Sequence, residues 1–150
     1  MPENKSLLPY FIVNIEAAIR KENRWLMCIR SEKESQAGGM LSLVGGKLEY
    51  SDPVKFSIEE AVKREVLEET GLRVSPIDYI HSSIFISNKG NHVLDIVYLC
   101  TITGESDRMK TSDEIQELKW MTIEEIKQHP RAQKWLIDSI KLVEDLYKRT

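Results

Sequence analysis

Three glutamates in the segment 64–72 have a spacing that could hold a metal ion. The segment reads Arg64-Glu65-Val66-Leu67-Glu68-Glu69-Thr70-Gly71-Leu72. Successive residues of an α-helix turn by about 100°, so Glu69 lies about 40° from Glu65, and Glu68 lies about 60° away on the other side. The apolar residues of the helix gather around Glu65 at this periodicity. Glu65 and Glu69 therefore interrupt the apolar stripe, whereas Glu68 lies toward the polar side.

Carboxylates at such positions need a positive partner. A partly buried ionised carboxylate costs free energy unless it is paired or bound to a cation, and converging carboxylates also repel each other. Magnesium or manganese, which accept oxygen ligands, would relieve both effects. The upstream pair Gly45-Gly46 permits close backbone approach, so that a carbonyl could reach a metal or an amide a phosphate. The alternative for the three glutamates is a charged rim around a core helix, and the alternative for the glycine pair is a simple tight turn.

The periodicity of apolar residues locates the elements that must position these groups. We expect strands at residues 11–20, 25–30, 40–44, 77–87, 93–103 and 118–121, the third ending at the glycine pair. Capping boxes at Ser57 and Thr122 begin two helices, and Gly71 ends the first. One face of the last helix carries Leu136, Ile140, Val143 and Tyr147. Turns rather than crossover helices join the strand pairs, which predicts an α/β domain with a mixed, largely antiparallel sheet.

Length and charge limit the class of protein. The 150 residues, 41% of them hydrophobic, fit a single domain over residues 1–150. A net charge of −3 disfavours a nucleic-acid partner, although a bound metal could still attract a small anionic substrate. We expect a cytoplasmic protein without a membrane span, because we find neither a secretory signal nor an apolar run of about 18 residues. Cys28 and Cys100 lie in apolar runs, which predicts buried, reduced thiols.

Gly46 together with segment 64–72 resembles the Nudix box of the MutT-like Nudix hydrolases. The second half matches the pattern arginine–glutamate–aliphatic–any–glutamate–glutamate–any–glycine–aliphatic in full. The resemblance implies an α/β/α sandwich, and Mg²⁺-dependent water attack on a phosphoanhydride bond of a nucleoside diphosphate linked to another group. Mn²⁺ is the alternative cation. The implied metal ligands are the Gly45 carbonyl and the carboxylates of Glu65, Glu68 and Glu69, while Arg64 would orient a neighbouring carboxylate.

The first half of the box departs from the family pattern. The family places a glutamate at a position that corresponds to Asp52 when counted from the glycine, and to Phe56 when counted from the arginine. The loop of residues 47–56 is therefore four residues longer than usual, and Asp52 is the candidate to replace the displaced acid. A later loop of the family supplies a further glutamate as metal ligand or general base. Its counterpart by spacing is Glu114, and Glu117 is the competitor.

The substrate is less well defined by the sequence. Gly46, Lys47 and Arg30 are the candidate phosphate contacts, and a nucleoside triphosphate is the first expectation for a short family member. The proline of ADP-ribose hydrolases would fall near Asn88 and is absent. Residues 26–31 are similar to part of the coenzyme A diphosphatase signature. A Nudix-fold nucleotide-binding or regulatory module without catalysis is the alternative from another class, and the family often forms homodimers.

Overall fold

Six strands form one mixed sheet within the residues that the computed structural model describes, which are 10–32, 38–105 and 112–149. The elements along the chain are β1 Ile12–Lys21, β2 Arg24–Arg30, β3 Leu41–Lys47, α1 Ser57–Thr70, β4 Leu72–Ile86, β5 His92–Glu105, β6 Ile115–Met121, α2 Ile123–Gln128 and α3 Lys134–Arg149. The strand order is β4-β5-β1-β3-β2-β6, and only the β1–β5 pairing is parallel. The predicted mixed, largely antiparallel sheet is confirmed.

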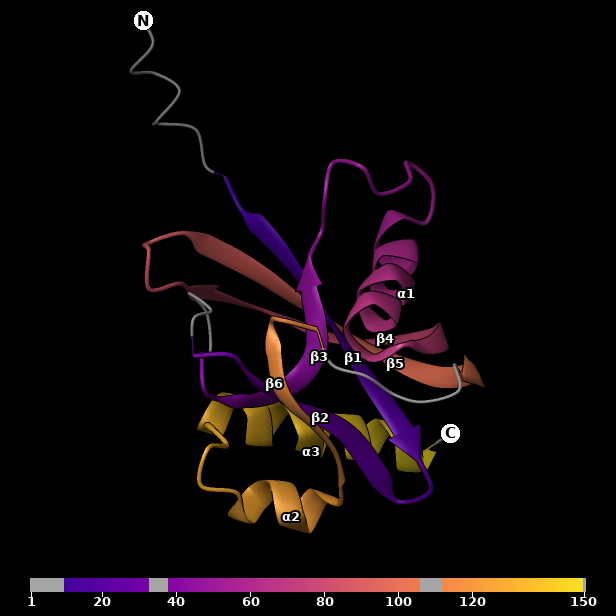
Figure 1. Ribbon diagram of the computed structural model, residues 1–150, viewed down its shortest axis with the longest axis vertical. Coiled ribbons are helices and arrows are strands. Elements are labelled where there is room, and N and C mark those ends of the chain that lie inside the picture. The colour runs from indigo at the N-terminus through magenta and orange to yellow at the C-terminus, as the bar shows by residue number, and fades with distance from the viewer. Residues whose placement is uncertain (1–9, 33–37, 106–111, 150) are drawn as a thin grey trace, which may run out of the picture.

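Helices cover both faces of the sheet, with α1 on one face and α2 with α3 on the other (Figure 1). The alternation of β2 shows how the sequence divides the core: Trp25 and Met27 pack toward α3, whereas Leu26 and Cys28 pack toward α1. Burial on both faces explains why this strand is an unbroken apolar run. Among the described residues, no helix combines the length and the apolar character needed to cross a membrane.

The predicted ends of the helices are partly confirmed. Gly71 ends α1 at φ 80°, and its amide donates to the Leu67 carbonyl over 2.9 Å. Thr122 and Glu125 form the predicted capping box of α2. The predicted capping box at Ser57 is wrong, because Phe56 stands at the N-cap with φ 55° and gives no side-chain cap bond. Ser57 is already the first helical residue, so its hydroxyl does not take the capping role.

Several strand boundaries differ from the prediction: β6 begins at Ile115 rather than at residue 118, and β3 and β4 are also longer than expected. β3 does not end at the glycine pair but continues through it to Lys47, because these residues still pair with β1. The two strands are so close that a Cβ on Gly45 would collide with the Ile15 carbonyl. β4 begins at Leu72 rather than at residue 77, and so includes Pro76. Proline is compatible with this strand because β4 lies at the edge of the sheet, where one row of backbone amides needs no partner.

Helix α3 is held to the sheet by a buried polar cluster as well as by its apolar face. Glu144 is 6% exposed and accepts a 2.7 Å hydrogen bond from the Trp25 indole N–H. The Arg20 guanidinium donates to the same carboxylate oxygen over 3.1 Å and lies 4.1 Å from the centre of the Tyr147 ring. Glu144 therefore joins α3 to both β1 and β2.

Replacing Glu144 with alanine leaves a buried indole N–H and a largely buried guanidinium without their acceptor. We expect the free energy of unfolding, measured by urea denaturation, to fall by about 2–3 kcal/mol. The matched control is Asp145→Ala, an exposed acid on the same helix, which should change stability by less than about 0.5 kcal/mol. Equal effects of the two substitutions would show that this cluster does not anchor α3.

Both thiols are expected to be unreactive in the native protein. Burial raises the pKa of Cys28 to about 11 and that of Cys100 to about 12, so almost no thiolate is present at neutral pH. Thiols of the native protein should react slowly with a thiol-specific reagent at pH 8. In denaturant, two thiols per chain should react rapidly. Rapid labelling of the folded protein would contradict this arrangement.

Candidate functional site

The three glutamates of α1 differ in exposure as their helical angles predict. Glu65 is 7% exposed and Glu69 is 2% exposed, among the apolar residues that α1 packs against the sheet. The Glu68 side chain is 60% exposed. The structure therefore places two carboxylates at the inner surface of the helix and the third at its rim.

Arg64 collects the polar groups around the start of this acidic cluster. Its Nε and Nη2 donate to the two carboxylate oxygens of Asp52 over 2.8 and 3.0 Å. Its Nη1 donates to Glu65 over 2.8 Å and to Glu68 over 3.4 Å. The guanidinium holds the pKa of Asp52 below its usual value. Of the two candidate positions for the displaced acid, Asp52 contacts the helix arginine and Phe56 is exposed; Glu49 of the same loop also lies 3.6 Å from the guanidinium.

Arg30 reaches the other buried glutamate from β2. Its Nη2 donates to the Gly45 carbonyl over 2.9 Å, and its Nη1 lies 3.5 Å from Glu69. The Gly45 amide also donates to Glu69, over 3.3 Å. A Cβ on Gly46 would collide with the Glu65 carboxylate, so glycine at this position leaves room for the acid. The glycine pair therefore meets α1 at both buried glutamates.

The charges of the buried acids are only partly offset by the arginines. Burial raises the pKa of Glu65, although Arg64 lowers it. Burial also raises the pKa of Glu69 to about 8, with Arg30 lowering it and the charges of Glu65 and Glu114 raising it. Such shifts mark a site with too little positive charge for its carboxylates.

Glu114, from the segment before β6, is the later acid that faces this cluster. Its charge raises the pKa of both Glu65 and Glu69, and it lines the same cavity as Glu65. Glu117 instead borders a separate small cavity on the α2 side, with Met27 and His129 among its walls. The geometry therefore favours Glu114 over Glu117.

The donors fit a hard divalent cation in kind, because they are carboxylates and a backbone carbonyl. In the part of the chain that the structure describes, no three acidic, histidine or cysteine side chains are gathered as a ready metal cluster. Arg64 and Arg30 hold the carboxylates in ion pairs instead. A cation binding between the Gly45 carbonyl and Glu69 would have to displace the Arg30 guanidinium from these two partners.

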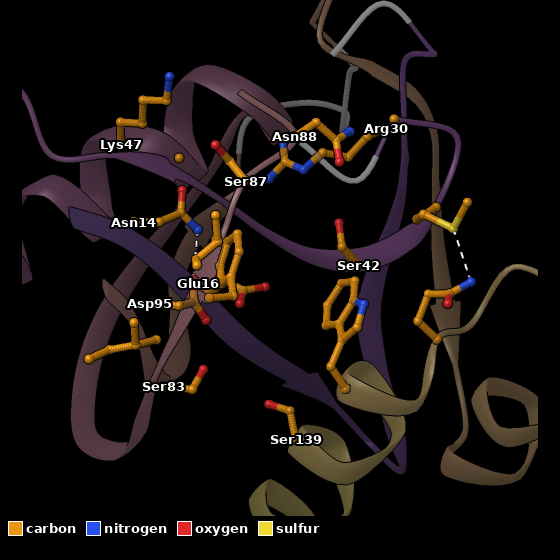
Figure 2. Close-up of a pocket in the computed structure, with 18 of the residues that line it drawn as sticks. Asn14, Glu16, Arg30, Ser42, Lys47, Ser83, Ser87, Asn88, Asp95 and Ser139 are labelled. Atoms are coloured by element: carbon orange, nitrogen blue, oxygen red, sulfur yellow. Dashed lines mark hydrogen bonds between the residues drawn. The ribbon is translucent and has the colours of Figure 1, made fainter. Parts of the chain in front are cut away.

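A cavity of about 880 Å³ extends from this cluster across the α3 side of the sheet. Its walls near the cluster include the three predicted phosphate contacts, Arg30, Gly46 and Lys47, together with Glu65 and Glu114. Figure 2 shows Arg30 and Lys47 along one border and Ser139 at the opposite end. The structure therefore brings these five predicted site residues to one cavity, while Gly45, Arg64, Glu68 and Glu69 lie outside its lining.

Sequence reasoning missed the far half of the cavity, where Asn14, Glu16 and Asp95 form one wall with Trp135 also in the lining. The available signal was the polar pair at alternate positions of β1, Asn14 and Glu16, in an otherwise apolar strand. Asp95 has no such signal, because its place next to Asn14 depends on the parallel pairing of two strands distant in the sequence.

Comparison with known proteins gives relatives of two kinds. An ADP-ribose pyrophosphatase of Methanocaldococcus jannaschii is 31% identical over 113 residues, which cover 74% of this chain and 62% of that protein. The chain thus spans less than two thirds of that relative. A MutT-like protein of Streptomyces ambofaciens is 29% identical over 125 residues, 83% of this chain and 73% of that one.

Solved structures show the same architecture. The MutT protein of Methanosarcina mazei Go1 superposes with a TM-score of 0.76 at 27% identity, over 93% of this chain and 97% of that one. A NUDIX hydrolase of Nitrosomonas europaea gives a TM-score of 0.77 at 20% identity, over 91% and 90% of the two chains. The model of the NUDIX domain matches residues 12–143. The chain therefore has the α/β Nudix fold and belongs to the Nudix family.

Proposed function

We propose that this protein is a divalent-metal-dependent hydrolase that cleaves a phosphoanhydride bond of a nucleoside diphosphate derivative by attack of water. The observation that carries the proposal is the placement of two buried glutamates, Glu65 and Glu69, beside Glu114 and the Gly45 carbonyl at one end of a large cavity. Family membership and the names of the two relatives, an ADP-ribose pyrophosphatase and a MutT-like protein, agree with this chemistry.

The proposed metal ligands are the Gly45 carbonyl and the carboxylates of Glu65, Glu68 and Glu69. Magnesium is the first candidate and manganese the second, because every ligand is an oxygen atom. When bound, such a cation neutralises phosphate charge and lowers the pKa of a water molecule.

The other residues of the cluster would orient the metal ligands, accept a proton from water and contact the phosphate. Arg64, fixed by Asp52, holds Glu65 and Glu68 in place. Glu114 borders the cavity beside the buried acids, a position suited to a general base that takes the proton of the attacking water. Arg30, Lys47 and the Gly46 amide line the same end and would contact the phosphate oxygens.

The substrate of first choice is a nucleoside triphosphate, as for a MutT-like protein, and ADP-ribose is the second. The test is a panel of ribo- and deoxyribonucleoside triphosphates, ADP-ribose and dinucleoside polyphosphates, each with Mg²⁺ or Mn²⁺. Release of phosphate, pyrophosphate or nucleoside monophosphate is measured with and without chelator. Absence of metal-dependent turnover throughout the panel would refute the proposed function.

Glu69→Gln removes one charge from the metal site with little change of shape. We expect kcat/KM to fall by about 100-fold or more, the size seen when one electrostatic group is removed from an active site. Mn²⁺ binding, followed by electron paramagnetic resonance of the free ion, should weaken in parallel. The matched control is Glu117→Gln, an acid that borders the other cavity, which should leave both quantities near wild type. Turnover of Glu69→Gln at the wild-type rate would contradict the assignment.

Asp52→Asn tests whether the loop acid positions Arg64. We expect kcat and the affinity for Mn²⁺ to fall by about 10- to 100-fold, as when a residue that orients a metal ligand is lost, while KM changes little. The control Glu60→Gln changes a partly exposed acid on α1 that forms an ion pair with Lys63, and it should have no effect. A loss of melting temperature without a change in kcat would assign Asp52 a purely structural role.

A further inference from the structure

A second group of acids lies in the cavity, away from α1. The parallel pairing of β1 with β5 places Asn14 opposite Asp95 in register. The Asn14 amide N–H donates to Asp95 over 2.7 Å, and Glu16 lies beside them in the wall of the same cavity. Asp95 is 6% exposed and Glu16 is half-buried. Figure 2 shows these three side chains, here named the acceptor wall, together on one side of the cavity.

The acceptor wall is costly as a purely structural feature. Two neighbouring carboxyl groups removed from water repel each other, and an apolar pair would fill the same space without that cost. The guanidinium whose charge lowers the pKa of Glu16 is that of Arg30, which is also bonded to Gly45 and Glu69. Burial, followed by the charge of Asp95, raises the pKa of Glu16.

One N–H of the Asn14 amide is used inside the wall, because it donates to Asp95. What the wall offers to the cavity is therefore mainly oxygen lone pairs, from Glu16, from Asp95 and from the Asn14 carbonyl. A ligand group that satisfies them must carry N–H or O–H donors. A carbonyl oxygen in the same place would set acceptor against acceptor and leave both without a hydrogen bond.

An aromatic side chain lines the same cavity. Trp135, near the start of α3, is 47% exposed, and Ser139 one turn later also borders the cavity. An exposed indole is a surface on which any nucleobase can stack, with little preference for sequence. The cavity continues from here to Lys47 and Glu65, where the proposed function places the diphosphate.

We propose that the acceptor wall and Trp135 bind the nucleobase of the substrate, and that Asp95 and Glu16 select bases with an exocyclic amino group over their keto counterparts. This inference rests on the proposed function for the position of the diphosphate. Trp135 supplies affinity for every base, whereas the acids supply the discrimination. A site built to receive the N–H donors of an exocyclic amino group rejects an analogue with a carbonyl oxygen in that place, because its buried acceptors are then left unpaired.

The test compares kcat/KM for two amino–keto pairs, ATP with ITP and CTP with UTP. We expect the wild-type enzyme to prefer the amino member by about tenfold or more, which corresponds to one hydrogen bond of about 1.4 kcal/mol. Asp95→Asn and Glu16→Gln, which replace an acceptor by a donor at nearly constant shape, should bring the ratio toward one. Glu117→Gln is the matched control and should keep the wild-type ratio.

Trp135→Leu separates stacking from selection. It should raise KM for both members of a pair and leave their ratio unchanged. Binding of AMP against IMP and of CMP against UMP, followed by tryptophan fluorescence, gives the same comparison without catalysis, and Trp135→Leu should abolish the signal. Melting temperatures near wild type for Asp95→Asn or Glu16→Gln show that a changed ratio is not a folding defect.

The outcomes separate the two proposals. Amino–keto ratios near one in the wild type, in both turnover and binding, overturn the inference even if metal-dependent hydrolysis is intact. A preference for amino bases in binding without turnover of any substrate supports the inference and refutes the proposed function. Discrimination between ribose and deoxyribose without discrimination between bases would show that the wall binds the sugar, and would also overturn the inference.

Discussion

The burial of two carboxylates on the inner surface of α1 is the constraint from which the arrangement of the site follows. Glu65 and Glu69 cannot be hydrated as surface acids are, so positive charge must be brought to them. Arg64 supplies it from the same helix and Arg30 from β2. Space must also be left for them, which explains why β3 carries glycine opposite Glu65. Helix, strand and arginines are therefore interdependent, since the loss of any one leaves a buried charge unpaired.

The Asp52–Arg64 ion pair connects the loop before α1 to the helix. Twelve positions separate the two residues, and the loop between them reaches the helix through Phe56 in a left-handed conformation. Lengthening a flexible loop costs little, about 0.6 kcal/mol for each doubling, so the chain can accommodate extra residues while keeping the bidentate bond. The loop acid is better identified by the guanidinium that it holds than by its distance along the sequence.

The features that the sequence predicted correctly are those that depend on local periodicity along one element. The turn angle of a helix separated buried Glu65 and Glu69 from exposed Glu68, and glycine chemistry located the end of α1. The prediction of a capping box at Ser57 is wrong because a serine can also be the first residue inside a helix, as Ser57 is here.

The acceptor wall could not be predicted, because Asp95 meets Asn14 only through a pairing of strands 81 positions apart. Contacts of this kind depend on the order of strands in the sheet, which alternation along a single strand does not encode. The polar positions of β1 were visible in the sequence, but the strand that completes their group was not.

The cavity therefore contains two acidic groups whose charge is managed differently. On α1, the ion pairs with arginine leave an excess of negative charge that a divalent cation would balance, whereas on β5 Asp95 accepts a hydrogen bond from the neutral Asn14 amide of β1. Arg30 connects them, because its charge lowers the pKa of both Glu69 and Glu16 while it is bonded to the Gly45 carbonyl. A cation that displaces this guanidinium from Gly45 changes the electrostatic potential at the acceptor wall as well. The proposed diphosphate and base subsites would thus be linked through one side chain, that of Arg30.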